Sequence, residues 1–197
     1  MKRIILLIVC LSTIILTEQN IANTEETISK KAYFAGGCFW CMEESFDKYE
    51  GVISSVSGYS GGHLDNPTYR DVIYKDTGHV ETIEITYNPK IISYEKLLNI
   101  FWKNIDPFDK YGQFCDKGKS YRSVAFYQDL NQKKIINKSL KNIEKKFNSE
   151  VFTLVWSFKK FYIAEDYHQD YYQKNLLKYL SYKKACQREE VLKKVWN

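Results

Sequence analysis

A pair of glycines separates a short apolar segment from a helix-compatible segment near the start of the chain. Residues 32–35 are apolar, Gly36 and Gly37 follow, and Cys38 opens the next segment. This order predicts a strand, a tight turn and a helix. It places Cys38 at the helix N-terminus, where unpaired N–H groups and the helix dipole favour a thiolate. Cys38 is therefore the candidate nucleophile. The alternative is a buried structural cysteine beside two core aromatic residues, Phe39 and Trp40.

The hydrophobic pattern of the remaining chain predicts one sheet covered by helices, an α+β fold. We expect long loops at 62–79 and 106–120. Ser93 should cap a helix that carries Leu97, Leu98, Phe101 and Trp102. The other expected helices span 39–49, 130–147 and 167–180, and the expected strands span 32–35, 52–59, 80–87, 122–128 and 151–156.

The first 31 residues differ from the rest. Lys2 and Arg3 precede an apolar run from Ile4 to Leu16, and a polar stretch follows to Lys31. This pattern is typical of a secretory signal, and the run is short for a membrane span. We expect residues 1–22 to be a signal peptide or an uncleaved signal anchor and 23–31 a polar linker. An N-terminal helix packed on the domain is the alternative.

Charge and cysteine content narrow the class of protein. The chain of 197 residues suits one domain, and its formal charge of +5 comes from lysines that do not cluster beside aromatic residues, which disfavours nucleic-acid binding. Outside the signal, the cysteines are Cys38, Cys41, Cys115 and Cys186. Only the first two have a zinc-like spacing, so a redox set is favoured over a zinc site.

Seven blocks of the chain resemble one known family. Gly36-Gly37-Cys38-Phe39-Trp40 is similar to the active-site motif of peptide methionine sulfoxide reductases of the A type. Six further blocks follow in that family's order: Gly58 to Gly62, Asn66 to Arg70, Gly78 to Glu81, Phe101 to Pro107, Gly118 to Ser123 and Ala164 to Gln169. The resemblance covers residues 32–197, which we take as the catalytic domain.

The resemblance implies a fold and a reaction. The expected fold is a two-layer sandwich with a ferredoxin-like core and long loops. The expected reaction is reduction of methionine-S-sulfoxide, free or in proteins, through a Cys sulfenic acid and an intramolecular disulfide. No metal or organic cofactor is implied. Oxidised proteins and free methionine sulfoxide would be substrates, thioredoxin or a periplasmic thiol would be the reductant, and the chain is expected to be an exported monomer.

Sulfoxide reduction requires a soft nucleophile, a proton donor and a pocket for the methyl group. Cys38 would attack sulfur, and Glu81, if its strand end is buried, would be kept protonated as a general acid. Tyr69 and Tyr121 could donate hydrogen bonds to the same oxygen. By resemblance, Asp116 is a further polar residue of the site, and Phe39 and Trp40 hold the methyl group.

A second thiol must condense with the sulfenic acid. The family's resolving cysteine lies near the C-terminus, often in Cys-Gly-Arg-Asp, whereas this chain has Cys186-Gln187-Arg188-Glu189. We expect Cys186, on a mobile tail, to be the resolver. Cys41 is the second choice, because a helical neighbour is far for a disulfide unless Cys38 is the cap. Cys115 ranks third, since a small buried filler is its favoured role.

Three other functions stay open from the sequence. A thioredoxin-like disulfide oxidoreductase would use Cys38 and Cys41 and do without Cys186. A thiol hydrolase would pair Cys38 with a histidine such as His79. A secreted binding domain would use its cysteines only as structural disulfides.

Overall fold

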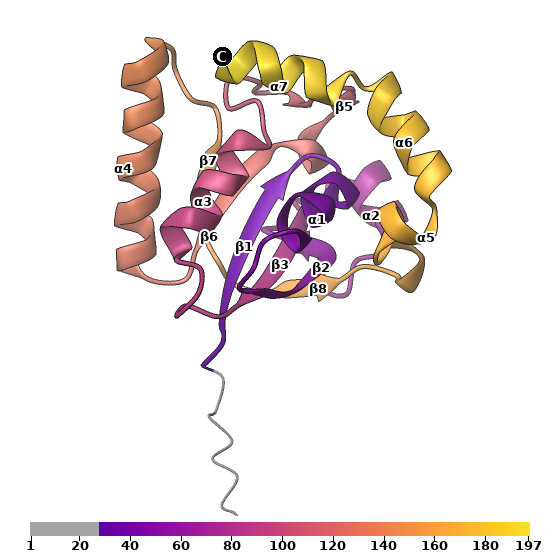
Figure 1. The fold of residues 1–197 in the computed structure, drawn as a ribbon. Helices are drawn as coiled ribbons and strands as arrows, with labels where there is room; N and C mark the ends of the chain where they lie inside the picture. Colours follow the sequence, from indigo (N-terminus) through magenta and orange to yellow (C-terminus); the bar gives the residue numbers. More distant parts are fainter. Residues whose placement is uncertain (1–27) are drawn as a thin grey trace, which may run out of the picture.

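A six-stranded sheet forms the centre of the molecule in the computed structural model, which describes residues 28–197 (Figure 1). Its strand order is β7-β6-β1-β3-β2-β8, and every pair is antiparallel except β6–β7, which is parallel. The strands are β1 (Lys30–Gly36), β2 (Val52–Ser60), β3 (Val80–Tyr87), β6 (Ser123–Tyr127), β7 (Leu154–Ser157) and β8 (Phe161–Ile163). Together with the helices, this sheet confirms the predicted α+β class.

The sheet is curled, because its two edges are joined by a very short connection. β7 and β8 lie at opposite edges, yet only residues 158–160 separate them in the chain. Such a connection spans at most about 14 Å, whereas the spacings across a flat six-stranded sheet total about 24 Å. Phe158, from this connection, stacks on Tyr33 of β1 with 3.7 Å between ring centroids. The face of the sheet opposite the main helices is thus covered by the connection itself.

Three helices, α1 (Phe39–Asp47), α3 (Tyr94–Lys103) and α4 (Leu130–Phe147), pack on the other face. Alternation along β1 explains the division, since Ala32 and Phe34 face these helices while Tyr33 and Ala35 face the connection. Phe34 stacks on Phe101 of α3 at 4.8 Å between ring centroids. The core on the helix side is therefore built from β1, β3 and the three helices.

Helix starts agree with the sequence where a capping residue is present. Ser93 caps α3 by accepting a hydrogen bond from the Lys96 N–H, and Asp129 caps α4 by accepting one from the Gln132 N–H. The helix predicted at 130–147 and the strand predicted at 80–87 have these bounds in the structure. β1 begins at Lys30, two residues inside the segment expected to be a linker.

Both segments predicted as loops contain short regular elements, so those predictions were incomplete. Helix α2 (Tyr69–Tyr74) lies within 62–79 and begins with a capping box between Thr68 and Asp71. The segment 106–120 contains the hairpin strands β4 (Gly112–Gln113) and β5 (Asp116–Lys117), and a 3₁₀ turn, η1 (Lys119–Tyr121), follows. Strand β8 was not predicted, and the strand expected at 151–156 begins at Leu154.

The C-terminal segment is helical to its end, which corrects the expectation of one helix followed by a mobile tail. A 3₁₀ turn, η2 (Asp166–His168), leads into α5 (Tyr171–Lys174), α6 (Leu176–Ala185) and α7 (Arg188–Trp196). The three helices pass around the α1 side of the domain (Figure 1). The Arg188 guanidinium fixes the first turn of α7 by donating to the Asn104 carbonyl at 2.5 Å.

The predicted signal segment, residues 1–22, lies outside the described residues. Within residues 28–197, no helix combines the length and the apolar content that crossing a membrane requires.

Candidate active site

The turn after β1 places Cys38 at the N-cap of α1. Gly37 has φ +77°, a left-handed conformation that favours glycine, and a Cβ there would lie 2.5 Å from Cβ of Gln113. Cys38 then adopts a non-helical conformation, φ −53° and ψ 117°, and its carbonyl accepts the Met42 N–H. The predicted strand, turn and helix are confirmed, with Cys38 as the capping residue.

Strand pairing explains why residues far apart in sequence meet at this turn. β1 runs antiparallel to both β3 and β6, so its end lies beside the start of each. Glu81 is the second residue of β3, and Tyr121 lies two residues before the start of β6. Helix α2, which begins at Tyr69, leads into β3 from the same side.

These residues line a cavity of about 220 Å³. Its lining contains Cys38, Phe39, Trp40, Tyr69, Glu81, Asp116, Tyr121 and Tyr182. Eight site residues were predicted from the sequence, and seven of them line this cavity. The exception is Cys186. The remaining lining residue, Tyr182, was not predicted.

Glu81 is buried, with 2% of its surface exposed. Burial raises the pKa of this carboxyl well above its usual range, and the nearby Asp116 charge adds to the shift, while the hydrogen bond that Glu81 accepts from the Phe39 N–H opposes it. That bond is 3.0 Å long. This shift favours the protonated form of Glu81, which can act as a proton donor.

Three hydroxyls lie around the same cavity. Burial raises the pKa of Tyr69 to about 12, and burial also raises the pKa of Tyr121 and of Tyr182. Tyr69 and Tyr121 are hydrogen-bonded to each other, and Tyr182 donates to the Asp116 carboxylate. All three hydroxyls keep their protons at physiological pH and can donate to an oxygen or a sulfur in the cavity.

Cys38 and Cys41 are both buried, both free and hydrogen-bonded to each other. Burial raises the pKa of Cys38, and the neighbouring Cys41 and Glu81 raise it further. The pKa of Cys41 falls to about 7, first because of the hydrogen bond with Cys38 and then because of the positive charges of Arg188 and Lys183. Burial thus opposes the thiolate that the helix N-terminus is expected to favour at Cys38. Within the substrate-free pair, Cys41 is therefore the thiol that loses its proton more readily.

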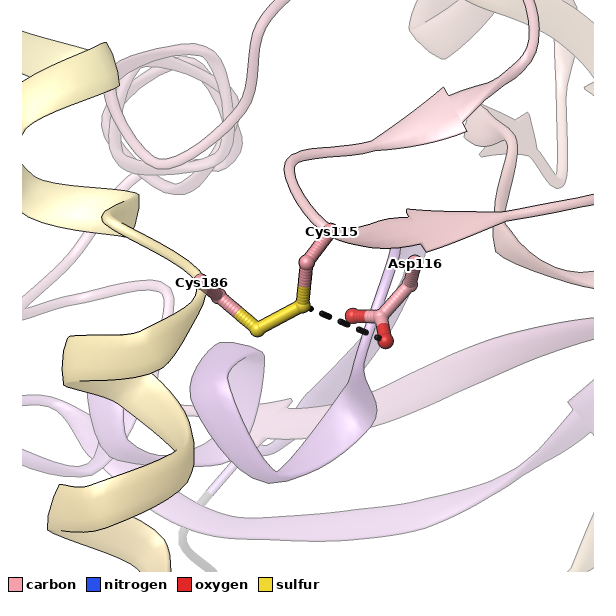
Figure 2. Close-up of side chains that lie close together, drawn as sticks. All are labelled: Cys115, Asp116 and Cys186. Carbon is pink, nitrogen blue, oxygen red and sulfur yellow. Dashed lines mark hydrogen bonds between the residues drawn. A yellow bond between two sulfur atoms is a disulfide. The ribbon is translucent and has the colours of Figure 1, made fainter.

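Cys186 forms a disulfide with Cys115, at 4.9 Å between their Cα atoms, and Figure 2 shows this bond beside the Asp116 carboxylate. Cys115 lies between β4 and β5 and is exposed, so the expectation of a buried filler is wrong. Cys186 is buried at the end of α6 rather than on a mobile tail. In this state the sulfur of Cys186 is not available to Cys38.

The described histidines do not support a Cys–His hydrolase. His79 is buried, with Nε2 on the Leu64 carbonyl at 2.8 Å and Nδ1 accepting the Gly62 N–H. Nδ1 of His168 accepts the Trp40 indole N–H at 3.2 Å, and burial lowers the pKa of His168 to about 4. His79 therefore holds the loop before β3, and His168 positions Trp40.

One group of described side chains has the spacing of a metal site. Ligand atoms of Cys115, Asp116 and Cys186 lie within 4.8 Å of one another. The two sulfurs are bonded to each other, so they cannot act as thiolate ligands in this state.

A buried cysteine at a helix cap, a second thiol beside it and a protonated carboxyl define a thiol-based oxidoreductase. The family described as peptide methionine sulfoxide reductase matches residues 30–197, and the chain belongs to this family. The peptide methionine sulfoxide reductase MsrA 2 of Staphylococcus aureus (strain MW2) is 48% identical over 167 residues, which cover 84% of this chain and 94% of the relative.

Solved structures show the same fold. Mxr1 from Saccharomyces cerevisiae in reduced form is 32% identical, with a TM-score of 0.71, and the match covers 75% of this chain and 86% of that one. A second structure, Mxr1 in complex with Trx2, is 25% identical with a TM-score of 0.52 and covers 73% and 84% of the two chains.

Proposed function

We propose that this enzyme reduces methionine-S-sulfoxide, in proteins and as the free amino acid, to methionine. The observation that carries this function is the cavity in which the Cys38 sulfur and the buried Glu81 carboxyl lie together. The repair of oxidised proteins follows from this activity. No cofactor is needed, because the thiols supply both electrons.

In the first step the Cys38 sulfur attacks the sulfoxide sulfur as the S–O bond weakens. Glu81 gives its proton to the leaving oxygen, and Tyr69 and Tyr121 hold that oxygen by hydrogen bonds. The oxygen is transferred to Cys38, so that methionine and a Cys38 sulfenic acid are the products. Cys41, whose thiolate neighbours Cys38, accepts the Cys38 proton before the attack.

Aromatic side chains select the methyl group. Phe39 is buried, and Trp40 stacks on Tyr171 at 3.8 Å between ring centroids with an interplanar angle of 11°. A rigid apolar wall beside the nucleophile accepts a methyl group and excludes a polar backbone. Asp116, which also lines the cavity, supplies a polar contact.

For the second step we place Cys41 before Cys186. Cys41 lies beside Cys38, and the capping conformation of Cys38 removes the objection that helical neighbours are too far apart. Condensation releases water and forms a Cys38–Cys41 disulfide. Cys186, the resolver expected from the sequence, would act only after the Cys115–Cys186 disulfide is reduced.

Thioredoxin is the proposed reductant of the resulting disulfide. The yeast relative Mxr1 has been solved in complex with Trx2. If the chain is exported, a periplasmic thiol reductant would reduce this disulfide instead. The enzyme is proposed to act as a monomer.

We further propose that residues 1–22 direct export, with the enzyme periplasmic or anchored by residues 4–16. Lys2 and Arg3 before the apolar run support this proposal. Fractionation of cells that carry the full chain and a chain lacking residues 1–22 would test it; recovery of both in the cytoplasm would contradict it.

The core is proposed to be a ferredoxin-like two-layer sandwich. The order β1-α1-β2-β3-α3-β6 along the chain and β6-β1-β3-β2 in the sheet support this assignment. β7 and β8 then extend the sheet at its two edges.

The deciding experiment is to incubate the purified enzyme with the two epimers of methionine sulfoxide and dithiothreitol. We expect methionine from the S epimer only, and no product from Cys38→Ser. Reduction of insulin disulfides without sulfoxide reduction would instead favour the disulfide oxidoreductase.

A further inference from the structure

Tyr182 is a residue of the cavity that the reaction described above leaves without a role. It lies on α6, and its ring meets the Trp40 ring edge-on at 5.9 Å between centroids. Its hydroxyl donates to the Asp116 carboxylate and is also within hydrogen-bonding reach of the Cys38 sulfur. One phenol therefore connects the wall of the cavity to the nucleophile.

The Cys38 sulfur needs such a donor. Burial removes water, and the neighbouring Cys41 and Glu81 further disfavour negative charge on Cys38. A hydrogen bond from Tyr182 would act in the opposite direction and lower the pKa of Cys38. A buried anion is stabilised mainly by hydrogen bonds that are already in place.

We propose that Tyr182 is a catalytic residue that donates a hydrogen bond to the Cys38 sulfur during its attack, and that the Cys115–Cys186 disulfide holds it in position. This inference rests on the proposed sulfoxide reduction and adds a residue to it. The electron count is unchanged, because Tyr182 supplies a hydrogen bond and transfers no proton.

Asp116 allows the phenol to change partners. Burial raises the pKa of Asp116, whose carboxylate accepts a hydrogen bond from the Tyr182 hydroxyl in the present structure. When Asp116 is protonated, it donates to the phenol oxygen and leaves the phenol proton for Cys38. The ionisable groups around this pair are Cys41, Glu81, Tyr69 and Tyr121. The positive charges of Arg188 and Lys117 act on Asp116, and those of Arg188 and Lys183 act on Cys41.

The disulfide joins the two elements that carry Tyr182 and Asp116. Cys115 directly precedes Asp116, and Cys186 lies one helical turn after Tyr182, with its N–H on the Tyr182 carbonyl at 3.0 Å. The bond between Cys115 and Cys186 thus fixes the β4–β5 hairpin against α6 (Figure 2). Breaking this bond frees both ends of the Tyr182–Asp116 contact.

The test begins with Tyr182→Phe, which removes the hydroxyl and keeps the ring against Trp40. We expect single-turnover methionine formation to slow by roughly 10- to 100-fold, as for loss of a hydrogen bond to a charged group, with little change in KM. Tyr172→Phe is the matched control, because that hydroxyl lies on α5 and donates to Asp47. The control should keep the wild-type rate.

The second measurement is the pH profile of Cys38 alkylation, followed by mass spectrometry of the peptide that carries Cys38, in a Cys41→Ser background. Tyr182→Phe should move the midpoint to higher pH, which a purely structural role would not do. The inference would be overturned if Tyr182→Phe left the alkylation midpoint of the Cys41→Ser parent unchanged and also left the wild-type single-turnover rate unchanged. Because alkylation needs no sulfoxide, this result is independent of the proposed function.

The role of the disulfide is tested by measuring the single-turnover rate effect of Tyr182→Phe in two backgrounds. One background is wild type, and the other is the double variant Cys115→Ser/Cys186→Ser. If the disulfide holds Tyr182, the effect of Tyr182→Phe should shrink several-fold when the disulfide is absent. An undiminished effect would refute this part. Wild type reduced only at Cys115 and Cys186, verified by peptide mapping, provides the same comparison if the double serine variant does not fold.

Discussion

Replacement of Glu81 by Gln tests the proton donor directly. The amide has the shape of the protonated carboxyl, and its oxygen can still accept the Phe39 N–H that Glu81 accepts at 3.0 Å. Folding and substrate binding should therefore persist, while proton transfer to the leaving oxygen is lost. General acid catalysis contributes about 10²–10⁴-fold, or about 2.7–5.5 kcal/mol of the barrier. We expect the reductive step to slow by that factor.

The pH dependence gives a second readout of the same group. Burial raises the pKa of Glu81, so the active, protonated form persists above the pH at which a free glutamate ionises and is lost as pH rises through the raised value. Wild type should lose the reductive rate on this alkaline limb. Glu81→Gln, slow at every pH, should lack that limb.

The assay is rapid-quench single turnover of reduced enzyme with a peptide that contains methionine-S-sulfoxide. Glu84→Gln is the control on the same strand, since the Glu84 carboxylate binds Lys31 and Tyr33 outside the cavity. Its rate should match wild type. A Glu81→Gln rate within about twofold of wild type would refute the assignment of Glu81 as the acid.

Three further changes have defined outcomes. Cys41→Ser should yield about one equivalent of methionine and then stall with thioredoxin as the reductant; continued turnover would contradict Cys41 as resolver. Glu43 has a pKa raised by burial to about 8, so its stabilising contribution is complete below pH ~4.5 and is lost towards pH 8. In Glu43→Gln the part of this slope that lies between pH 6 and pH 9, at most about 3 kcal/mol, should disappear from urea unfolding measured at those two pH values. Gly58→Ala should destabilise the protein, because its Cβ would lie 2.3 Å from the Phe161 ring; an unchanged Tm would show that β8 can move away.

The fold was predictable where local signals and the core agree. Ser93 and Asp129 start their helices as their side chains require, and the apolar alternation of β3 gives its bounds. β8 was not predicted because three residues carry too little periodicity, and it forms only where the curled sheet brings it to β2. Helix α2 could have been found from the Thr68–Asp71 capping box.

The site was predictable to the extent that family motifs mark it. Cys38, Glu81, Tyr69 and Tyr121 line one cavity, as the strand pairing requires. Tyr182 was missed because it is one of 16 tyrosines and stands outside the recognised blocks. The pairing of Cys115 with Cys186 depends on how α6 lies against the β4–β5 hairpin, which no local pattern records. The pKa shifts of the two thiols could not be predicted for the same reason, since they depend on burial, which is a property of the folded chain.

The wrapping of α6 around the start of α1 has a consequence for synthesis. Every strand of the sheet ends by Ile163, so the sheet can form before the ribosome has released α6 and α7. At that stage Cys38 and Cys41 belong to a nascent domain in which α6 and α7 are not yet in place. The side chains of Tyr182, Lys183 and Arg188 therefore do not yet surround the two thiols. The thiol pair acquires its charge environment only when the last helix leaves the exit tunnel. A chain released early thus carries the reactive motif without the environment that tunes it.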